Sequence, residues 1–146
     1  MTASAEQVAK ILGGPKVLGR RPKTMGDWMQ VIEAGLPVSA VEALKEKVGL
    51  DDSSVAAALG ISARTLARTR AGQIRLDSVV SDRLYRLARL IAIAEEVLEH
   101  EDRAVQWLMQ RQFGLGQYRP IDLMRSEPGA REVENLLLRI EHGVYS

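Results

Sequence analysis

Arginine is the residue type with the clearest chemical potential in this sequence, and it is concentrated in one segment. Between Ile61 and Leu90 the acidic residues are Asp77 and Asp82, against a much longer set of arginines: Arg64, Arg68, Arg70, Arg75, Arg83, Arg86 and Arg89. A guanidinium group can donate two hydrogen bonds to a guanine edge or to a phosphate. The segment is therefore a candidate nucleic-acid surface, although the formal net charge of the whole chain is only +1.

The other reactive residue types are sparse. His100 and His142 are the only histidines, there is no cysteine, and neither histidine has the surroundings of a catalytic triad. Glu96 and His100 offer one helical pair, which is too few ligands for zinc. Gly13-Gly14-Pro15-Lys16 lacks the pattern of a phosphate-binding loop. We expect no enzymatic activity, no cofactor and no metal.

An acidic run follows the arginine-rich segment and gives the middle of the chain a second face of opposite charge. Its members are Glu95, Glu96, Glu99, Glu101 and Asp102. This run fits either a second binding face or a solvated helix surface.

Composition limits the class of protein. The chain has 146 residues, 46% of them hydrophobic, which suits one domain or two small helical modules. The lack of cysteine suits a reducing compartment, and neither a signal peptide nor an apolar run of about 18 residues is present. We expect a soluble cytoplasmic protein without a membrane partner.

The hydrophobic residues recur every three or four positions, which predicts an all-α fold. The expected helices are 4–12, 24–34, 39–48, two short helices on either side of Gly60, 77–100, a helix from Asp102 that ends at 113–116, 120–124 and 126–142. Ser4, Thr24, Ser39, Ser62, Asp77, Asp102 and Ser126 are the expected N-caps. The predicted units are an N-terminal leader (1–36), a helix-turn-helix domain (37–101) and a C-terminal domain (102–146). Whether residues 1–36 are ordered stays open.

The segment 51–70 has the features of a helix-turn-helix. Ala56 is small where two helices cross, Gly60 permits the turn, and Leu66 anchors the second helix. The outward residues are Ser62, Ala63, Arg64, Ala67 and Arg68. Arg64 and Arg68 are predicted to read bases, whereas Arg70, Arg75 and basic residues of the leader are predicted to contact phosphates. This arrangement resembles the Xre-type helix-turn-helix of phage-repressor-like regulators. The alternative is a pair of core helices with a solvated arginine face.

The C-terminal segment 114–146 resembles the Xre/MbcA/ParS toxin-binding domain. In that family a Pro-x-Asp-Leu-Met/Leu-Arg turn precedes a helix that ends in Arg-Ile-Glu-x-Gly-Val-Tyr. The matching residues are Pro120, Asp122, Leu123, Met124 and Arg125, then Arg139, Ile140, Glu141, Gly143, Val144 and Tyr145. The resemblance implies an antitoxin whose partner is a RES-domain toxin that consumes NAD, and whose C-terminal domain blocks the toxin's active site.

Without the family, the last helix still predicts a polar face opposite the stripe of Val133, Leu137 and Ile140. Combined with the resemblance, this face and the end of the chain give the expected toxin-binding residues: Arg131, Asn135, Arg139, Glu141, His142, Gly143, Val144, Tyr145 and Ser146. The last three would form a short hook that enters a pocket of the partner. The alternative is that Val144 and Tyr145 fold back onto the core.

The expected partners are a toxin, operator DNA and a second copy of the chain, with a higher hetero-oligomer formed with the toxin. A dimer is expected because one recognition helix covers few base pairs, so that two copies would read a roughly palindromic operator. The competing function is a transcriptional regulator whose C-terminal domain only dimerises or senses a ligand. A nucleic-acid enzyme would need clustered carboxylates with supporting metal ligands, which the acidic run lacks.

Overall fold

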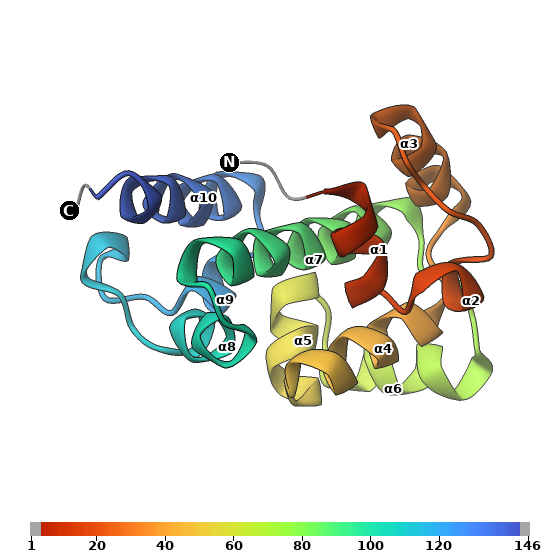
Figure 1. The fold of residues 1–146 in the computed structure, drawn as a ribbon. Coiled ribbons are helices and arrows are strands. Elements are labelled where there is room, and N and C mark those ends of the chain that lie inside the picture. Colours follow the sequence, from red (N-terminus) through yellow and green to blue (C-terminus); the bar gives the residue numbers. More distant parts are fainter. Residues whose placement is uncertain (1–3, 144–146) are drawn as a thin grey trace.

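The computed structural model describes residues 4–143, and these residues form helices and connecting turns without a strand (Figure 1). The elements are α1 (Ala5–Ile11), α2 (Gly14–Leu18), α3 (Met25–Ala34), α4 (Val38–Val48), α5 (Asp52–Leu59), α6 (Ala63–Gly72), α7 (Ser78–Leu98), α8 (Glu101–Met109), the 3-10 helix η1 (Phe113–Leu115), α9 (Pro120–Leu123) and α10 (Glu127–Glu141). The expected all-α fold is confirmed. Within this range, no helix combines the length and apolarity that a membrane crossing requires.

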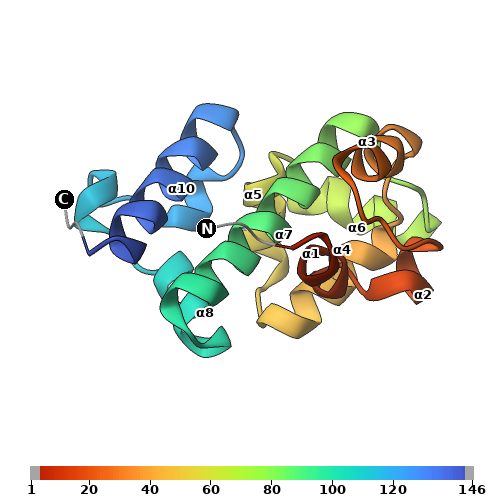
Figure 2. The same ribbon diagram turned by 45° about the horizontal axis from the view of Figure 1, so that its top comes forward.

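The long helix α7 is the axis of the molecule. Figures 1 and 2 show α1 and α3 beside its first half and α8 and α10 beside its second half. Leu84, Leu87 and Ile91 are fully buried along it and recur at helical spacing. Because α7 contributes to both halves, one continuous hydrophobic core joins the helix-turn-helix region to the C-terminal helices.

Most of the expected helix starts agree with the structure. The side chains of Ser4, Thr24, Ser62, Asp77 and Ser126 each accept a hydrogen bond from a backbone N–H of the first turn. Such bonds satisfy N–H groups that have no partner inside the helix.

Two expected caps are wrong. Helix α4 begins at Val38 after Pro37, so Ser39 lies inside the helix; the extended backbone of Pro37 (φ −69°, ψ 150°) sets the start without a side-chain cap. Helix α8 is capped by His100, whose Nδ1 accepts from the Asp102 N–H at 3.0 Å. The imidazole thus takes the position assigned to Asp102. Helix α8 also ends at Met109, earlier than expected, and η1 is separate from it.

The segment 4–36 packs against the rest of the protein and contributes side chains to the core. Val8, Ile11 and Leu12 are at most 2% exposed, and α1 packs against α7. In the segment 14–23, Leu18 and Pro22 are buried, and Gly14–Leu18 form α2. The N-terminal segment is therefore part of the packed structure that supports α7.

Ser81 is a buried polar residue that holds the start of α7 to the end of α3. Its hydroxyl accepts from the Leu36 N–H at 2.8 Å and donates to the Leu76 carbonyl at 3.3 Å.

We expect Ser81→Ala to lower the free energy of unfolding by about 1–3 kcal/mol, because the buried Leu36 N–H loses its partner. Denaturant unfolding measures this, with exposed Ser39→Ala as the control at a change within about 0.5 kcal/mol. Equal stabilities of the two variants would contradict the assignment.

Candidate functional site

Helices α5 and α6 meet in the geometry that the sequence predicts for a helix-turn-helix. Gly60 joins them in the left-handed region at φ 69°, and a Cβ there would lie 2.8 Å from Nη1 of Arg83. Ala56 of α5 is 2% exposed, and Leu66 of α6 is fully buried. The small Ala56 side chain and the core residue Leu66 therefore hold α6 in place. A side chain at position 60 would be both strained and crowded.

The opposite face of α6 is open to solvent. Ser62, Ala63, Arg64, Ala67 and Arg68 are all exposed. Arg64 and Arg68 are four residues apart, which places them on one face of the helix. Neither has an ion pair within residues 4–143. An exposed helix with two such arginines has the shape and charge to enter a major groove.

The other two arginines of the predicted DNA surface are engaged within the chain. Arg70 bonds Glu42 on α4 through Nε at 2.5 Å and Asp52 on α5 through Nη2 at 2.8 Å. Arg75 donates from Nη1 to the Gly35 carbonyl at 2.7 Å. Their guanidinium groups position α6 and the segment after it. Both guanidinium groups therefore have partners within the chain, and contact of Arg70 and Arg75 with phosphates stays a prediction.

Asp52, Arg70 and Lys45 form an ion-pair cluster, because both basic side chains contact the Asp52 carboxylate. Hydrogen bonds from Arg70, then from Lys45, hold the pKa of Asp52 well below its ordinary value of 3.8. A depressed pKa stabilises the fold above about pH 4, and this stabilisation is lost as the pH falls toward the folded-state pKa.

We expect unfolding curves of Asp52→Asn to show a shallower loss of stability than the parent chain between about pH 4 and pH 2. Glu33→Gln removes an exposed carboxylate that has no ion pair among the described residues, and it should follow the parent curve. Coincident pH profiles for Asp52→Asn and the parent would contradict the role of the cluster.

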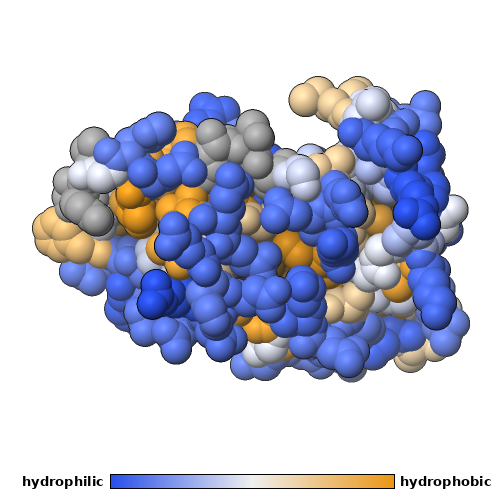
Figure 3. Space-filling view, in the orientation of Figure 1, coloured by the Kyte–Doolittle hydropathy of each residue, from blue (hydrophilic) through white to orange (hydrophobic). Residues whose placement is uncertain are grey.

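Helix α10 presents the polar face predicted for the C-terminal domain. Val133 and Leu137 are fully buried, while Arg131, Asn135 and His142 are exposed. Arg131 pairs with Glu127 at 2.6 Å along the same helix. Figure 3 shows hydrophobic residues reaching the surface among the polar ones over this part of the molecule. The face is therefore mixed in polarity, as docking surfaces commonly are.

Three members of the predicted toxin-binding set lie at the C-terminal end of α10. Arg139 is half-buried, and its Nε atom has no hydrogen-bond partner within residues 4–143. Glu141 is exposed and lies 4.0 Å from His142. Gly143 follows the helix in the left-handed region at φ 74°. Val144, Tyr145 and Ser146, the predicted hook, lie outside the described residues.

The sequence interpretation missed two exposed aromatic residues between α8 and α9. Phe113 is 78% exposed and Tyr118 is 58% exposed. Their loop is closed by the Gln112 N–H, which donates to the Tyr118 carbonyl at 3.1 Å, and η1 packs against α10. An aromatic residue in a glycine-rich turn was the available signal. Phe113 therefore exposes an apolar side chain on η1, which packs against α10.

Both histidines lie at helix ends. His100 caps α8, His142 follows α10, and no group of three metal-ligand side chains occurs within residues 4–143.

This arrangement defines a helix-turn-helix protein with a second helical unit built on the same long helix. Two family descriptions match it: the antitoxin Xre-like helix-turn-helix domain over residues 27–89, and the antitoxin Xre/MbcA/ParS C-terminal toxin-binding domain over residues 94–143. The first match begins inside α3, so it includes part of the segment 1–36.

Known proteins agree with these matches. Antitoxin Xre of Photorhabdus laumondii is 30% identical over 117 residues, which cover 80% of this chain and 79% of the relative. Antitoxin Xre of Yersinia enterocolitica is 30% identical over 116 residues, which cover 79% and 78%. A chain in the crystal structure of the M. tuberculosis MbcT-MbcA toxin-antitoxin complex is 28% identical with a TM-score of 0.55, covering 75% of this chain and 96% of that one. The chain belongs to the Xre antitoxin family.

Proposed function

We propose that this antitoxin binds a cognate RES-type toxin, occludes the site at which that toxin consumes NAD, and represses its own operon by binding DNA. The observation that carries the proposal is the pair of separate exposed surfaces, α6 and α10, that one core holds in place. A protein with two such surfaces can bind DNA and a protein partner at once.

The toxin-binding half rests on the C-terminal domain and its relatives. The mixed surface of α10, with Arg131, Asn135 and the neighbouring Phe113, offers hydrogen bonds and apolar area to a partner. The similar chain from M. tuberculosis is described in a complex of toxin and antitoxin. The RES identity and the use of NAD follow from the family resemblance. Inhibition requires only that the antitoxin cover the site, so it performs no chemistry itself.

The DNA-binding half rests on α6. Arg64 and Arg68 are predicted to contact bases, and Ser62, Ala63 and Ala67 leave room for close approach to the groove. We propose that two copies bind a roughly palindromic operator, because one recognition helix reads only a few base pairs. In the competing function, a regulator without a toxin partner, α10 would serve only dimerisation or ligand sensing.

Co-expression of the chain with the protein encoded beside it tests the proposal. We expect the two proteins to co-purify, and the neighbour expressed alone to deplete cellular NAD. A neighbour that binds the chain but leaves NAD unchanged would refute the RES assignment. Failure of the two to co-purify, together with specific binding of the chain to its promoter, would favour the competing regulator.

A further inference from the structure

We infer that the DNA-binding surface extends beyond the helix-turn-helix onto the C-terminal domain, where Arg111 and Arg125, with Arg83 of α7, bind backbone phosphates of the same DNA. This inference rests on the proposed DNA binding. It is carried by the position of these three arginines, here called the basic strip, beside α5 and the turn that follows it.

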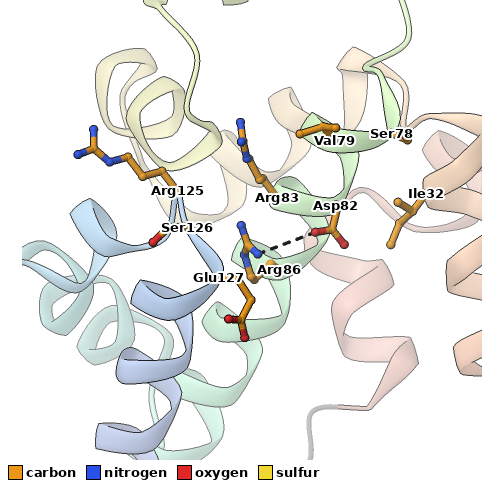
Figure 4. A pocket seen from close by; sticks show the side chains of 9 residues that line it. All are labelled: Ile32, Ser78, Val79, Asp82, Arg83, Arg86, Arg125, Ser126 and Glu127. Carbon is orange, nitrogen blue, oxygen red and sulfur yellow. Dashed lines mark ion pairs between the residues drawn. The ribbon is translucent and has the colours of Figure 1, made fainter.

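The basic strip borders two open grooves that meet at Arg125. The first groove, of about 560 Å³, is lined by Arg83 and Arg125 together with the start of α10 (Figure 4). The second, also of about 560 Å³, is lined by Arg111, Arg125 and Ala57 of α5. Ala57 places the second groove beside α5, the first helix of the helix-turn-helix.

The helix-turn-helix turn is in direct contact with the strip. Arg83 donates from Nη1 to the Leu59 carbonyl at 3.1 Å, at the end of α5. A Cβ on Gly60 would lie 3.8 Å from Cβ of Arg125 and 2.8 Å from Nη1 of Arg83. Figure 4 shows Arg83 and Arg125 near this end of α5, with the Arg125 side chain turned outward. The turn that leads into α6 is thus flanked by arginines from outside α5 and α6.

The charges of the strip are not neutralised by ion pairs within residues 4–143. The acidic residues that line the two grooves are Asp82, Asp122 and Glu127. Each is paired with an arginine outside the strip: Asp82 with Arg86 at 3.9 Å, Asp122 with Arg119 at 2.8 Å, and Glu127 with Arg131 at 2.6 Å. Asp122 also attracts Arg111 and Arg125, but Arg119 bonds both of its oxygens.

An extended polyanion fits this surface better than an isolated acidic side chain. Phosphates flank the major groove on both sides, so a protein whose α6 enters the groove brings the residues around the turn close to the backbone. Ala57 and Gly60 are exposed and small, which leaves the arginines as the projecting groups. Phosphate contacts of this kind add affinity that does not depend on base sequence and falls with salt.

The experiment measures binding of the full-length chain to a duplex from its own promoter and to a scrambled duplex, over a range of salt concentrations. We expect Arg111→Gln with Arg125→Gln to weaken binding to both duplexes and to reduce the slope of log affinity against log salt by about two, since each phosphate contact contributes about 0.9. Co-purification with the toxin should be unchanged.

The matched control is Lys47→Gln with Arg103→Gln, which removes two charges from exposed residues of α4 and α8, where Lys47 pairs with Glu101. Its salt slope should stay close to that of the parent. Equal slopes for the strip variant and the control would overturn the inference while leaving the proposed DNA binding intact. If the strip variant no longer co-purifies with the toxin but its affinity for DNA keeps the parent's salt dependence, the strip binds the toxin and the inference is overturned. A parent chain that binds neither duplex overturns both proposals.

Discussion

Replacing Arg64 and Arg68 together by alanine is expected to abolish sequence-specific binding to the promoter while the fold and the toxin complex remain. Each bidentate contact of an arginine with a guanine discriminates by about 1–3 kcal/mol. Loss of two contacts then weakens specific binding by about 30-fold to 10⁴-fold, at about 1.4 kcal/mol per factor of ten. Both side chains are exposed, so their removal leaves the core untouched.

A competition assay with promoter and scrambled duplexes measures this effect, and circular dichroism checks the helical content. Lys47→Ala with Arg103→Ala removes the same charge from exposed positions outside α6 and should keep the preference for the promoter. If the Arg64/Arg68 variant still prefers the promoter as strongly as the parent does, α6 is not the recognition helix. This test differs from the test of the basic strip, because the strip variant is expected to weaken binding to the promoter duplex and to the scrambled duplex alike.

Deleting Val144, Tyr145 and Ser146 is expected to separate binding of the toxin from its neutralisation. These residues follow Gly143, whose backbone lies in the left-handed region after α10. If they enter the NAD site of the toxin while α10 supplies the affinity, the truncated chain still co-purifies with the toxin. The toxin in that complex regains NAD consumption, up to the rate of the free toxin.

The contrasting variant is Leu137→Asp, which places a charge at a fully buried position of α10. An unpaired buried charge is destabilising by several kcal/mol, so this helix should detach from α7 and the complex should be lost. The two variants therefore predict opposite results in co-purification and the same result in NAD consumption. A truncated chain that protects NAD as well as the full-length chain does would refute occlusion by the hook.

Local features of this protein were predictable from the sequence alone. Ser62 capping α6, Gly60 turning the chain and the apolar period of α7 depend on residues within four positions of one another. Capping bonds, left-handed turns and helix periodicity act over that range, so short segments of the sequence are enough to predict most of the order of the helices. Pro37 and His100 were exceptions, because each replaced a more usual cap nearby.

The tertiary structure determines which arginine side chains form ion pairs within the chain and which are exposed. Arg70 and Arg64 look alike in the sequence, but the fold brings Glu42 and Asp52 to Arg70 from 28 and 18 residues away and leaves Arg64 exposed. In the same way it brings Arg125 from a different domain beside Gly60. Ion pairs and shared surfaces depend on how whole helices pack together, and that packing is set by the common core around α7, which no short segment of the sequence contains.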